Sequence, residues 1–346
     1  MLIKLLKKII VLGGLLGLVG SLFLGYQFNR FQHEPIEMRD EAIRFIIPSG
    51  NTVRQVAQKL ADSGYIKDPV MFIALARLKG ESTVIKAGEY LIQPGVTPDD
   101  LIRIFSQGDS VQHGFTIIEG WTFDQLLDAL ANDPILVQTI EDRSHAAVLQ
   151  KLGLQLEHPE GWFLPDTYHF PRGTTDVEFL RRAHHSMQRK LDELWPQRDP
   201  ELPLETPYDA LILASIIEKE TGAAFERPLI AAAFIERLRR GMRLQTDPTI
   251  IYGLGQEFDG DIRYRDLRRD TPYNTYLHRG LTPTPIALPG ADAIHAALHP
   301  AESDAIYFVS KGDGTHHFST TLEEHNRAVS KYQLKGRKPR RQAEPG

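Results

Sequence analysis

The stretch YDALILASIIEKETG, residues 208–222, has the composition of a helix buried on nearly every side. Almost every side chain from Leu211 to Ile217 is apolar, so we expect this helix to lie at the centre of a folded domain. Glu218 follows directly, four residues after Ala214 and seven after Leu211, and therefore continues the same helical stripe. The pattern places one carboxyl group at the edge of an apolar core.

Glu218 is the first candidate for catalysis in the sequence. Burial disfavours the charged form of a carboxyl group, which raises its pKa and allows it to act as an acid near neutral pH. The alternative is an ordinary last-turn residue that has already left the core. Lys219 and Glu220 fall on other faces of the helix, where we expect them to be solvated.

Length and composition set the frame around this helix. The chain has 346 residues, which corresponds to two domains of about 150 residues each. Its 42% hydrophobic and 25% charged residues are typical of folded protein and argue against a disordered chain, a fibre or a transporter with many spans. A net charge of −5 gives no overall basic field, so we expect no nucleic-acid partner.

The chain contains no cysteine, which excludes disulfides, thiol nucleophiles and cysteine-ligated metals. His295 and His299 have the spacing of a helical ligand pair, but the glutamate of an HExxH motif is missing. We therefore predict neither a metal nor a cofactor, which leaves carboxyl groups to carry the chemistry.

The N-terminal region has the pattern of a membrane anchor. Lys4, Lys7 and Lys8 precede the uncharged run IIVLGGLLGLVGSLFLGYQFN, residues 9–29. About 20 apolar residues cross the hydrocarbon layer, and lysines in front of the run predict that residues 1–8 stay in the cytoplasm. The alternative, a cleaved signal peptide, has a shorter apolar region and a small-residue cleavage site, where this chain has Phe28 and Phe31. We predict an uncleaved transmembrane anchor over 9–29.

Three segments after the anchor share one template. They are IIPSGNTVRQVAQKLADSG (46–64), LIQPGVTPDDLIRIFSQG (91–108) and TIIEGWTFDQLLDALAND (116–133). Each has a short strand pattern, a turn glycine, a threonine two residues later that suits a helix N-cap, and an amphipathic helix. The pattern resembles LysM carbohydrate-binding modules; the alternative is generic α+β packing. We predict a LysM-like α+β module over 30–110, with the third copy in the domain that follows.

Polar and aromatic clusters are dense from residue 157 onward. They include EGWFLPDTY (160–168), QTDPT (245–249) and TPYNTY (271–276), in which aromatic rings suit sugar rings and polar groups suit their hydroxyls. The candidates for contacting a sugar are Asp166, Gln245, Asp247, Asn274, Tyr276 and Glu324. Turn and cap roles compete with this interpretation, above all for Asp166 in a turn and for Asp247 as an N-cap before Pro248.

The C-terminal part has three simpler patterns. Residues 305–310 and 315–319 flank KGDG and predict a β-hairpin. Glu323 stands three residues after Thr320, which predicts a capping box for the final helix. The basic tail over 333–346 is rich in proline and glycine, and we predict that it is disordered.

Taken together, the motifs resemble the YceG-like (MltG) family of endolytic murein lytic transglycosylases. The motifs are EGWFLPDTY, ASIIEKET, QTDPTIIYG, TPYNTYLHRGL with PTPIALPG, and YFVSKGDGTHHFSTTLEEHN, in this order. The resemblance covers essentially the whole chain. Thr282 and Thr284 depart from it, because the family more often has proline and glycine there. The implied architecture is α+β: a single N-terminal transmembrane helix, a small LysM-like module and a larger α/β-mixed catalytic domain over 111–332.

The resemblance also implies an activity, which is cleavage of the bond between N-acetylmuramic acid and N-acetylglucosamine inside nascent peptidoglycan strands. The products carry 1,6-anhydro ends, and the cleavage terminates strand elongation. By matching motif, Glu218 is the acid and then the base, and the six sugar-contact candidates shape the cleft. The implied setting is the bacterial inner membrane, with the bulk of the chain periplasmic and associated with glycan-polymerising synthases.

Two other functions remain open from the residues alone. One is a peptidoglycan hydrolase in which Glu218 works with a second carboxylate, Asp166 or Asp247. The other is a non-enzymatic scaffold that binds wall glycan through the LysM-like module and recruits synthases.

Overall fold

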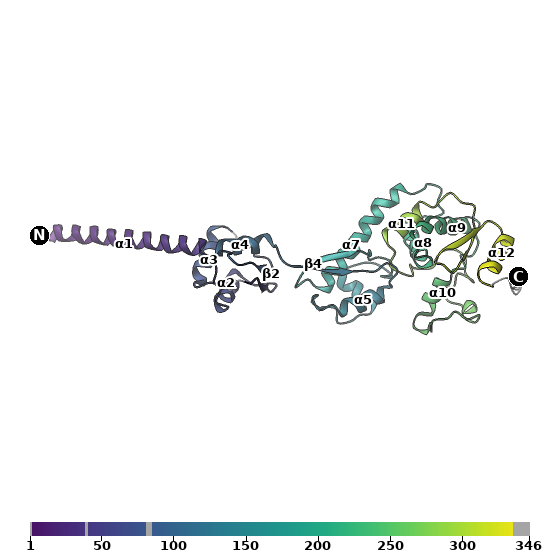
Figure 1. Ribbon diagram of the computed structural model, residues 1–346, viewed down its shortest axis with the longest axis horizontal. Helices are drawn as coiled ribbons and strands as arrows, with labels where there is room; N and C mark the ends of the chain where they lie inside the picture. The colour runs from purple at the N-terminus through teal and green to yellow at the C-terminus, as the bar shows by residue number, and fades with distance from the viewer. Residues whose placement is uncertain (1, 39–40, 81–84, 335–346) are drawn as a thin grey trace. The chain divides into compact units, whose positions relative to one another are not determined.

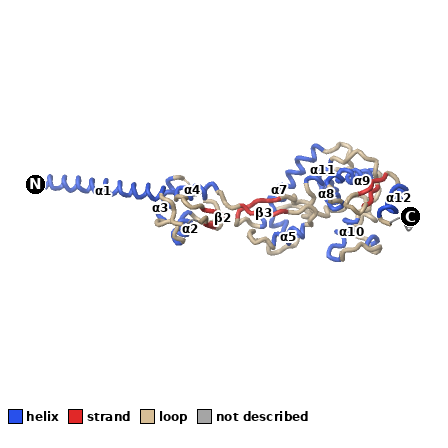
Figure 2. Tube along the Cα trace, viewed as in Figure 1, coloured by secondary structure: helices blue, strands red, loops and turns tan. Residues whose placement is uncertain are grey.

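The computed structural model describes residues 2–38, 41–80 and 85–334 of the chain. Over these residues the fold is mixed α+β, with short two-stranded sheets set among many helices (Figures 1 and 2). The tail predicted to be disordered, 333–346, lies outside the described residues from position 335 onward.

The helices and strands follow one another without long regular repeats. The α-helices are α1 (Leu2–His33), α2 (Val53–Asp62), α3 (Pro69–Leu78), α4 (Pro98–Gln107), α5 (Phe123–Ala131), α6 (His145–Leu152), α7 (Asp176–Leu194), α8 (Pro207–Glu220), α9 (Arg227–Arg239), α10 (Asp247–Leu254), α11 (Ala291–Leu298) and α12 (Leu322–Tyr332). The strands are β1 (Ile43–Ile47), β2 (Gly88–Ile92), β3 (Gln112–Thr116), β4 (Thr167–Pro171), β5 (Tyr307–Ser310) and β6 (His316–Ser319). Short 3₁₀ turns lie at Trp195–Gln197, Ala224–Glu226, Gly255–Glu257 and Asp266–Arg268.

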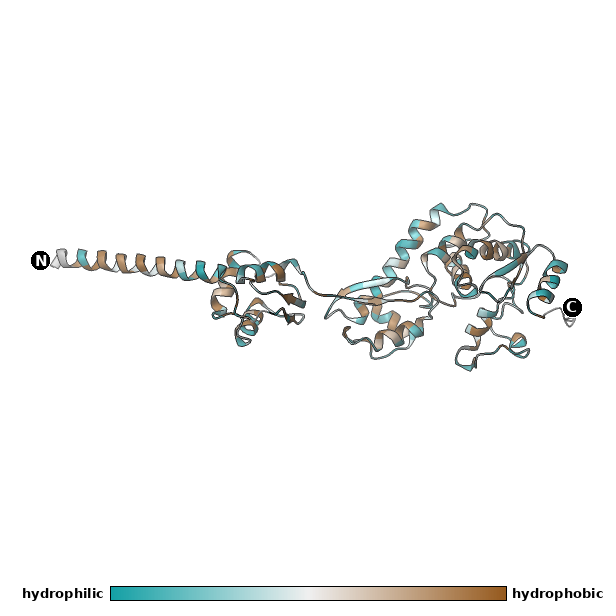
Figure 3. Cartoon of the chain, in the orientation of Figure 1, coloured by the Kyte–Doolittle hydropathy of each residue, from teal (hydrophilic) through white to brown (hydrophobic). Residues whose placement is uncertain are grey.

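Helix α1 contains the predicted anchor. Its stretch Leu6–His33 is long and apolar enough to cross a membrane, and Figure 3 shows its run of hydrophobic residues. The apolar side chains of this stretch are exposed rather than packed into the protein. At the other end of the helix, Phe28 and Phe31 are half-buried against the apolar core that follows. The helix therefore continues without a break from the apolar run into contact with folded protein.

Contacts divide the chain into two compact units, residues 1–113 with 169–174, and residues 114–168 with 175–346. In the first unit β1 and β2 pair antiparallel, with Phe45 opposite Tyr90. Helix α4 supplies Phe105, whose ring stacks on Phe45 and meets Tyr90 edge to face. All three aromatic side chains are buried, so the core of this unit forms between the β1–β2 sheet and its helices.

The predicted turns and caps of the three similar segments are confirmed. The turn glycines Gly50, Gly95 and Gly120 have φ of 80°, 85° and 76°, a region that favours glycine. The threonines two residues later, Thr52, Thr97 and Thr122, are N-caps, each in a capping box. The third strand differs from the prediction, because β3 ends at residue 116, where the predicted strand begins. It pairs with β4.

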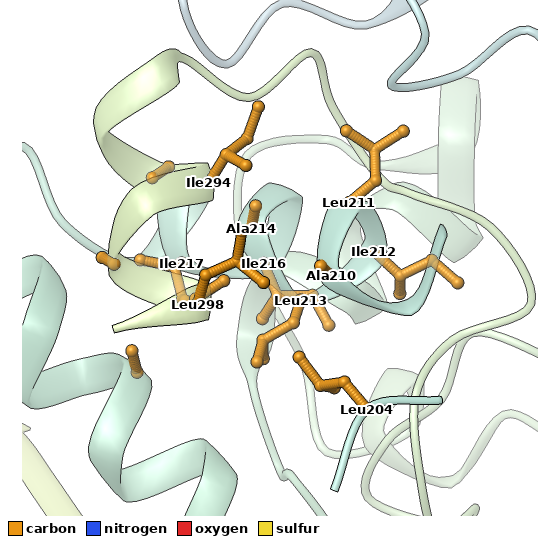
Figure 4. Packing of buried hydrophobic residues seen from close by; sticks show 14 of the residues in the cluster. Leu204, Ala210, Leu211, Ile212, Leu213, Ala214, Ile216, Ile217, Ile294 and Leu298 are labelled. Atoms are coloured by element: carbon orange, nitrogen blue, oxygen red, sulfur yellow. The ribbon is translucent and has the colours of Figure 1, made fainter. Parts of the chain in front are cut away.

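Helix α8 is buried at the centre of the second unit, as its composition predicts. Every side chain from Ala210 to Ile217 is less than a tenth exposed. Figure 4 shows the apolar residues of this stretch packed with Ile294 and Leu298 of α11. Helices α7 and α9 also contribute to this core. Burial on all sides of the helix fixes its position, and with it the position of the glutamate that follows Ile217.

Two loops lie against α8. The Ser215 hydroxyl accepts a hydrogen bond of 3.0 Å from the Ile286 amide, which holds the loop after residue 280 on the helix. Gly161 has φ of 83°, and a Cβ placed there would lie 2.6 Å from Pro285 and 3.3 Å from Leu211. Glycine is therefore required where the 160–165 loop meets both the helix and the second loop. Thr284 does not take a positive φ, so its departure from the family pattern adds no backbone strain.

The C-terminal hairpin is confirmed. Strands β5 and β6 pair antiparallel, with Phe308 opposite Phe318. Helix α12 packs against both strands. Its capping box is formed by Thr321 and Glu324, so the predicted box with Glu323 is wrong by one residue because the helix begins one residue later.

Candidate active site

Glu218 lies in the last turn of α8, where the buried helix reaches the edge of its core. Its side chain is only 5% exposed. One carboxylate oxygen, Oε1, accepts a hydrogen bond of 3.0 Å from Nη2 of Arg227. The other, Oε2, accepts one of 2.9 Å from the backbone amide of Gly290, the N-cap of α11. The carboxyl group is therefore fixed at both oxygens.

Opposing effects set the proton affinity of Glu218. Burial raises the pKa of this carboxyl, whereas the Gly290 amide and the Arg227 guanidinium lower it by stabilising the anion. The nearby Glu119 raises it again. The net result is a pKa above the ordinary value of 4.5, which suits a group that gives up a proton and later takes one back.

Arg227, at the start of α9, is shared by several carboxylates. Its side chain is 9% exposed, and the nitrogen that contacts Glu218 also lies 3.2 Å from Oε2 of Glu119. Its Nη1 lies 3.6 Å from the more exposed Asp292. Its Nε is buried and has no hydrogen-bond partner among the described residues. The guanidinium therefore contacts carboxylates through its two terminal nitrogens and not through Nε.

Glu119 lies at this site, although no motif in the sequence singles it out. It stands before the turn glycine of the third similar segment, where the first two segments have Ser49 and Pro94. That replacement of a small or rigid residue by a carboxylate is the signal in the sequence. A Cβ on Gly290 would lie 1.9 Å from Oε1 of Glu119, so the Glu119 carboxylate rests against the same backbone that donates to Glu218.

Glu220 is half-buried and hydrogen-bonded, which corrects the expectation from the helical pattern that it is solvated. The segment after residue 243 packs over the end of α8, and the Thr246 hydroxyl donates a hydrogen bond of 2.5 Å to Oε1 of Glu220. Burial raises the pKa of Glu220 to about 7. A second carboxyl group with a raised pKa therefore lies two residues from Glu218.

Gln245 has the strained backbone of the site. Its φ is 51°, and among the described residues it is the only one other than glycine with a positive φ. The Gln245 amide donates a hydrogen bond of 3.2 Å to the carbonyl of Thr275. The Thr246 amide donates one of 3.1 Å to the hydroxyl of the same threonine. These bonds hold the backbone in place while the Gln245 residue stays exposed. Strain of this kind clusters at functional sites.

Asp247 does not cap α10, so the predicted N-cap is wrong. Thr246 is the cap residue, and its hydroxyl is committed to Glu220 rather than to the helix. The Asp247 carboxylate instead accepts a hydrogen bond of 2.6 Å from the hydroxyl of Tyr276. The structure thus brings three of the predicted sugar contacts, Gln245, Asp247 and Tyr276, together beside Glu220.

The other three predicted contacts have local partners. Asn274 is buried; its amide donates to the carbonyls of Leu267 and Arg269 and its oxygen accepts from the Tyr276 amide, an arrangement that favours a structural role. Asp166 is exposed at the start of β4 and accepts from the neighbouring Thr167 amide. Glu324 is bound in its capping box and lines a groove of about 710 Å³ beside α12 and β6.

Glu160 is a further buried carboxyl group. It accepts 2.9 Å from the Phe123 amide at the start of α5 and 3.1 Å from the Tyr252 hydroxyl of α10. Burial raises the pKa of Glu160 to about 8, so the group is mostly protonated at neutral pH. It joins three segments of the second unit through one side chain.

Comparison with known proteins shows which family the chain belongs to. The sequence model of the YceG-like family matches residues 45–331. A protein of Bacillus subtilis (strain 168), named endolytic murein transglycosylase, is 32% identical over 91% of this chain and 91% of its own. A protein of the same name from Streptococcus pneumoniae (strain D39) is 28% identical over 90% of this chain, which spans 62% of that relative.

A solved structure is also similar. The crystal structure of a YceG-like protein from Listeria monocytogenes matches with a TM-score of 0.51 and 31% identity, and the match covers 84% of this chain and 100% of that one. A family model that spans most of the chain and relatives of this identity and coverage agree with one another. The chain belongs to the YceG-like family.

Proposed function

We propose that this chain is an endolytic murein transglycosylase, a lyase that cuts peptidoglycan glycan strands between N-acetylmuramic acid and N-acetylglucosamine. The names of its relatives support a murein transglycosylase. The observation that carries the proposal is Glu218: a buried carboxyl with a raised pKa, held by Arg227 and the Gly290 amide at the end of the central helix. One such group is sufficient for a reaction that uses no water.

In the first step, protonated Glu218 donates its proton to the glycosidic oxygen. The bond between this oxygen and C1 of the muramyl sugar breaks, and the departing sugar keeps the proton as a hydroxyl group. Positive charge develops at C1, and Glu218 becomes a carboxylate that the Gly290 amide and Arg227 stabilise.

In the second step, the Glu218 carboxylate removes the proton from the C6 hydroxyl of the muramyl sugar. The O6 oxygen attacks C1 and forms the 1,6-anhydro bond, and Glu218 is protonated again for the next cycle. The raised pKa brings the protonated form of Glu218 closer to neutral pH, while the Gly290 amide and Arg227 stabilise the carboxylate that removes the second proton.

Three of the predicted contacts, Gln245, Asp247 and Tyr276, are proposed to hold the glycan. Exposed Gln245 and the hydrogen-bonded pair of Asp247 and Tyr276 offer an amide, a carboxylate and a ring to sugar hydroxyls and faces. Residues 30–110, within the first compact unit, are proposed to form a LysM-like module that binds glycan. Its turn-and-cap pattern supports this assignment.

The apolar helix supports a proposed cellular setting. The apolar helix α1 holds the chain in the bacterial inner membrane as a single span, with the lysines in the cytoplasm and the rest in the periplasm. Cleavage of nascent strands there would terminate elongation, in association with glycan-polymerising synthases.

The decisive experiment is a comparison of purified wild-type chain with Glu218→Gln on isolated glycan strands. Wild type is expected to produce 1,6-anhydro ends by mass analysis, and the variant is expected to lose activity by about 10²–10⁴-fold. Glu323→Gln is the matched control, because Glu323 is 83% exposed and pairs only with Arg327 in the described contacts. Cleavage by Glu218→Gln at the wild-type rate would refute the mechanism.

The same products test a hydrolase. The sharing of Arg227 by Glu218 and Glu119 gives that alternative a second carboxylate at the site, whereas Asp247 is bonded to Tyr276 and Asp166 to its own turn. Reducing ends that incorporate labelled oxygen from water would favour hydrolysis over the lyase reaction. Binding of strands without any cleavage would favour the scaffold.

A further inference from the structure

Two glutamates meet at one nitrogen of Arg227. Oε1 of Glu218 lies 3.0 Å from Nη2, and Oε2 of Glu119 lies 3.2 Å from the same atom. The two carboxylates differ in environment, because Glu218 is 5% exposed and Glu119 is 47% exposed. Nη2 of Arg227 thus contacts both the buried carboxylate of Glu218 and the half-exposed carboxylate of Glu119.

The segment that carries Glu119 is held tightly. The Gly120 amide donates a hydrogen bond of 2.9 Å to the Leu288 carbonyl, and the Leu288 amide donates one of 2.7 Å to the Trp121 carbonyl. Lys219 donates 3.1 Å to the Gly120 carbonyl. These bonds fix Glu119 against the backbone of Gly290, where a Cβ would overlap with it. The backbone next to Glu119 is therefore held in place, and the Glu119 carboxylate reaches Arg227 from this fixed position.

The charged and polar groups near Glu218 come from four parts of the second unit. Arg227 faces it from α9, the Gly290 amide from the start of α11, and Glu119 from the segment before α5. On its own helix, Lys219 is exposed and bonded to the Gly120 carbonyl. Asp292 meets Arg227 at the longer distance of 3.6 Å and is 78% exposed. Among the described residues, Glu119 and Asp292 are the two other carboxylates that contact Arg227. Of these, only Glu119 lies at hydrogen-bond distance from Nη2, the nitrogen that binds Glu218.

We propose that Glu119 is a positioning residue that acts through Arg227: by holding part of the guanidinium charge, it keeps the Glu218 carboxyl able to carry the proton that the reaction needs. Without the Glu119 charge, Arg227 would act on Glu218 alone and would stabilise its anion more strongly. Glu119 also adds its own negative charge near Glu218, which acts in the same direction. This inference rests on the proposed lyase reaction.

The test is the pH dependence of kcat/KM for formation of anhydro ends, measured with the full chain in detergent. The alkaline limb of this profile reports the acid in the free enzyme. Glu119→Gln keeps the size of the side chain and its contact with Arg227 but removes the charge. We expect the alkaline midpoint to move to lower pH by about one unit. Asp292→Asn is the matched control, and we expect its shift to be less than about 0.3 unit because this residue is exposed and farther away.

Other outcomes separate the possible roles. An unshifted limb, or a limb that moves to higher pH in Glu119→Gln, would overturn the proposal. A rise in KM with an unshifted limb would also overturn it and would make Glu119 a substrate contact. If thermal unfolding shows that Glu119→Gln does not fold, Glu119→Ala provides the same test, because it removes the charge and leaves space above Gly290. Failure of the wild type to produce anhydro ends would instead refute the proposed function itself.

Discussion

Nη2 of Arg227 lies 3.0 Å from Oε1 of Glu218, and both side chains are less than a tenth exposed. In this buried pair, removal from water disfavours the carboxylate while the guanidinium favours it. The balance between these two effects decides whether Glu218 is protonated when a glycan strand arrives.

Replacement of Arg227 by glutamine should move that balance toward the protonated form. We expect the alkaline limb of the activity profile to shift to higher pH, opposite to the shift for Glu119→Gln, and kcat/KM to fall. Loss of one partner of a buried pair costs about 3–5 kcal/mol when the other stays charged. Because Glu218 escapes this cost by protonation, the loss of unfolding free energy should be smaller at pH 5 than at pH 8. Equal losses at both pH values, measured by chemical denaturation, would contradict this account.

Gly290→Ala tests the Glu119 contact by displacement. The added Cβ would lie 1.9 Å from Oε1 of Glu119, but this is the end of a flexible, half-exposed side chain that is able to move away. We therefore expect a stability loss below about 1 kcal/mol and a shift of the alkaline limb in the same direction as for Glu119→Gln. Gly222→Ala is the control, because a Cβ there meets nothing within 4 Å. Matching profiles for the two alanine variants would argue against a role of this contact.

Glu160→Gln should alter stability in a pH-dependent way. Burial raises the pKa of Glu160 from 4.5 to about 8, so the folded protein holds this proton more tightly than the unfolded chain. The resulting stabilisation is complete below about pH 4.5 and is lost as the pH rises through about 8. Glutamine resembles the protonated acid, so the variant should match wild type at pH 4.5 and be the more stable protein at pH 9. Urea denaturation at both pH values measures this, and a variant that is less stable at pH 9 would contradict it.

Gln245 allows backbone strain to be separated from side-chain contact. Glycine at its φ of 51° removes the strain, whereas alanine retains it. We expect Gln245→Gly to be more stable than Gln245→Ala by about 1 kcal/mol. If the carboxamide contacts the glycan, both variants should show a similar increase in KM. Thermal unfolding and steady-state cleavage measure the two effects, and wild-type KM in both variants would remove Gln245 from the site.

The anchor helix offers a prediction about where the chain tolerates truncation. Phe28 and Phe31 pack against the core of the first unit, so residues 26–33 belong to the fold although they end the apolar helix. A chain that starts at residue 26 should unfold at a higher temperature than one that starts at residue 34. Burial of each of these rings contributes about 1–2 kcal/mol. Equal unfolding temperatures in calorimetry would show that the two rings add nothing.

The sequence anticipates the local features because short-range rules set them. The threonine caps and turn glycines of the three similar segments follow from side-chain hydrogen bonding and from the conformational freedom of glycine. The errors at Asp247 and Glu323 are one-residue shifts of the same rules. At Asp247 the local rule failed because a tertiary contact, the Tyr276 hydroxyl, was available to the carboxylate.

Patterns along the chain predict the apolar N-terminal helix, the buried central helix and the place of Glu218 at the end of that helix, since hydrophobic runs and helical periodicity are properties of neighbouring residues. The surroundings of Glu218 depend instead on tertiary contacts. Arg227 lies nine residues away in the chain, Gly290 lies 72 away, and Glu119 reaches Arg227 across 108. Glu220 is half-buried because the segment at Thr246 packs against it and donates a hydrogen bond to its carboxylate. A pKa depends on charges and solvent within a few ångströms, and no pattern along the chain specifies which distant residues will occupy that space.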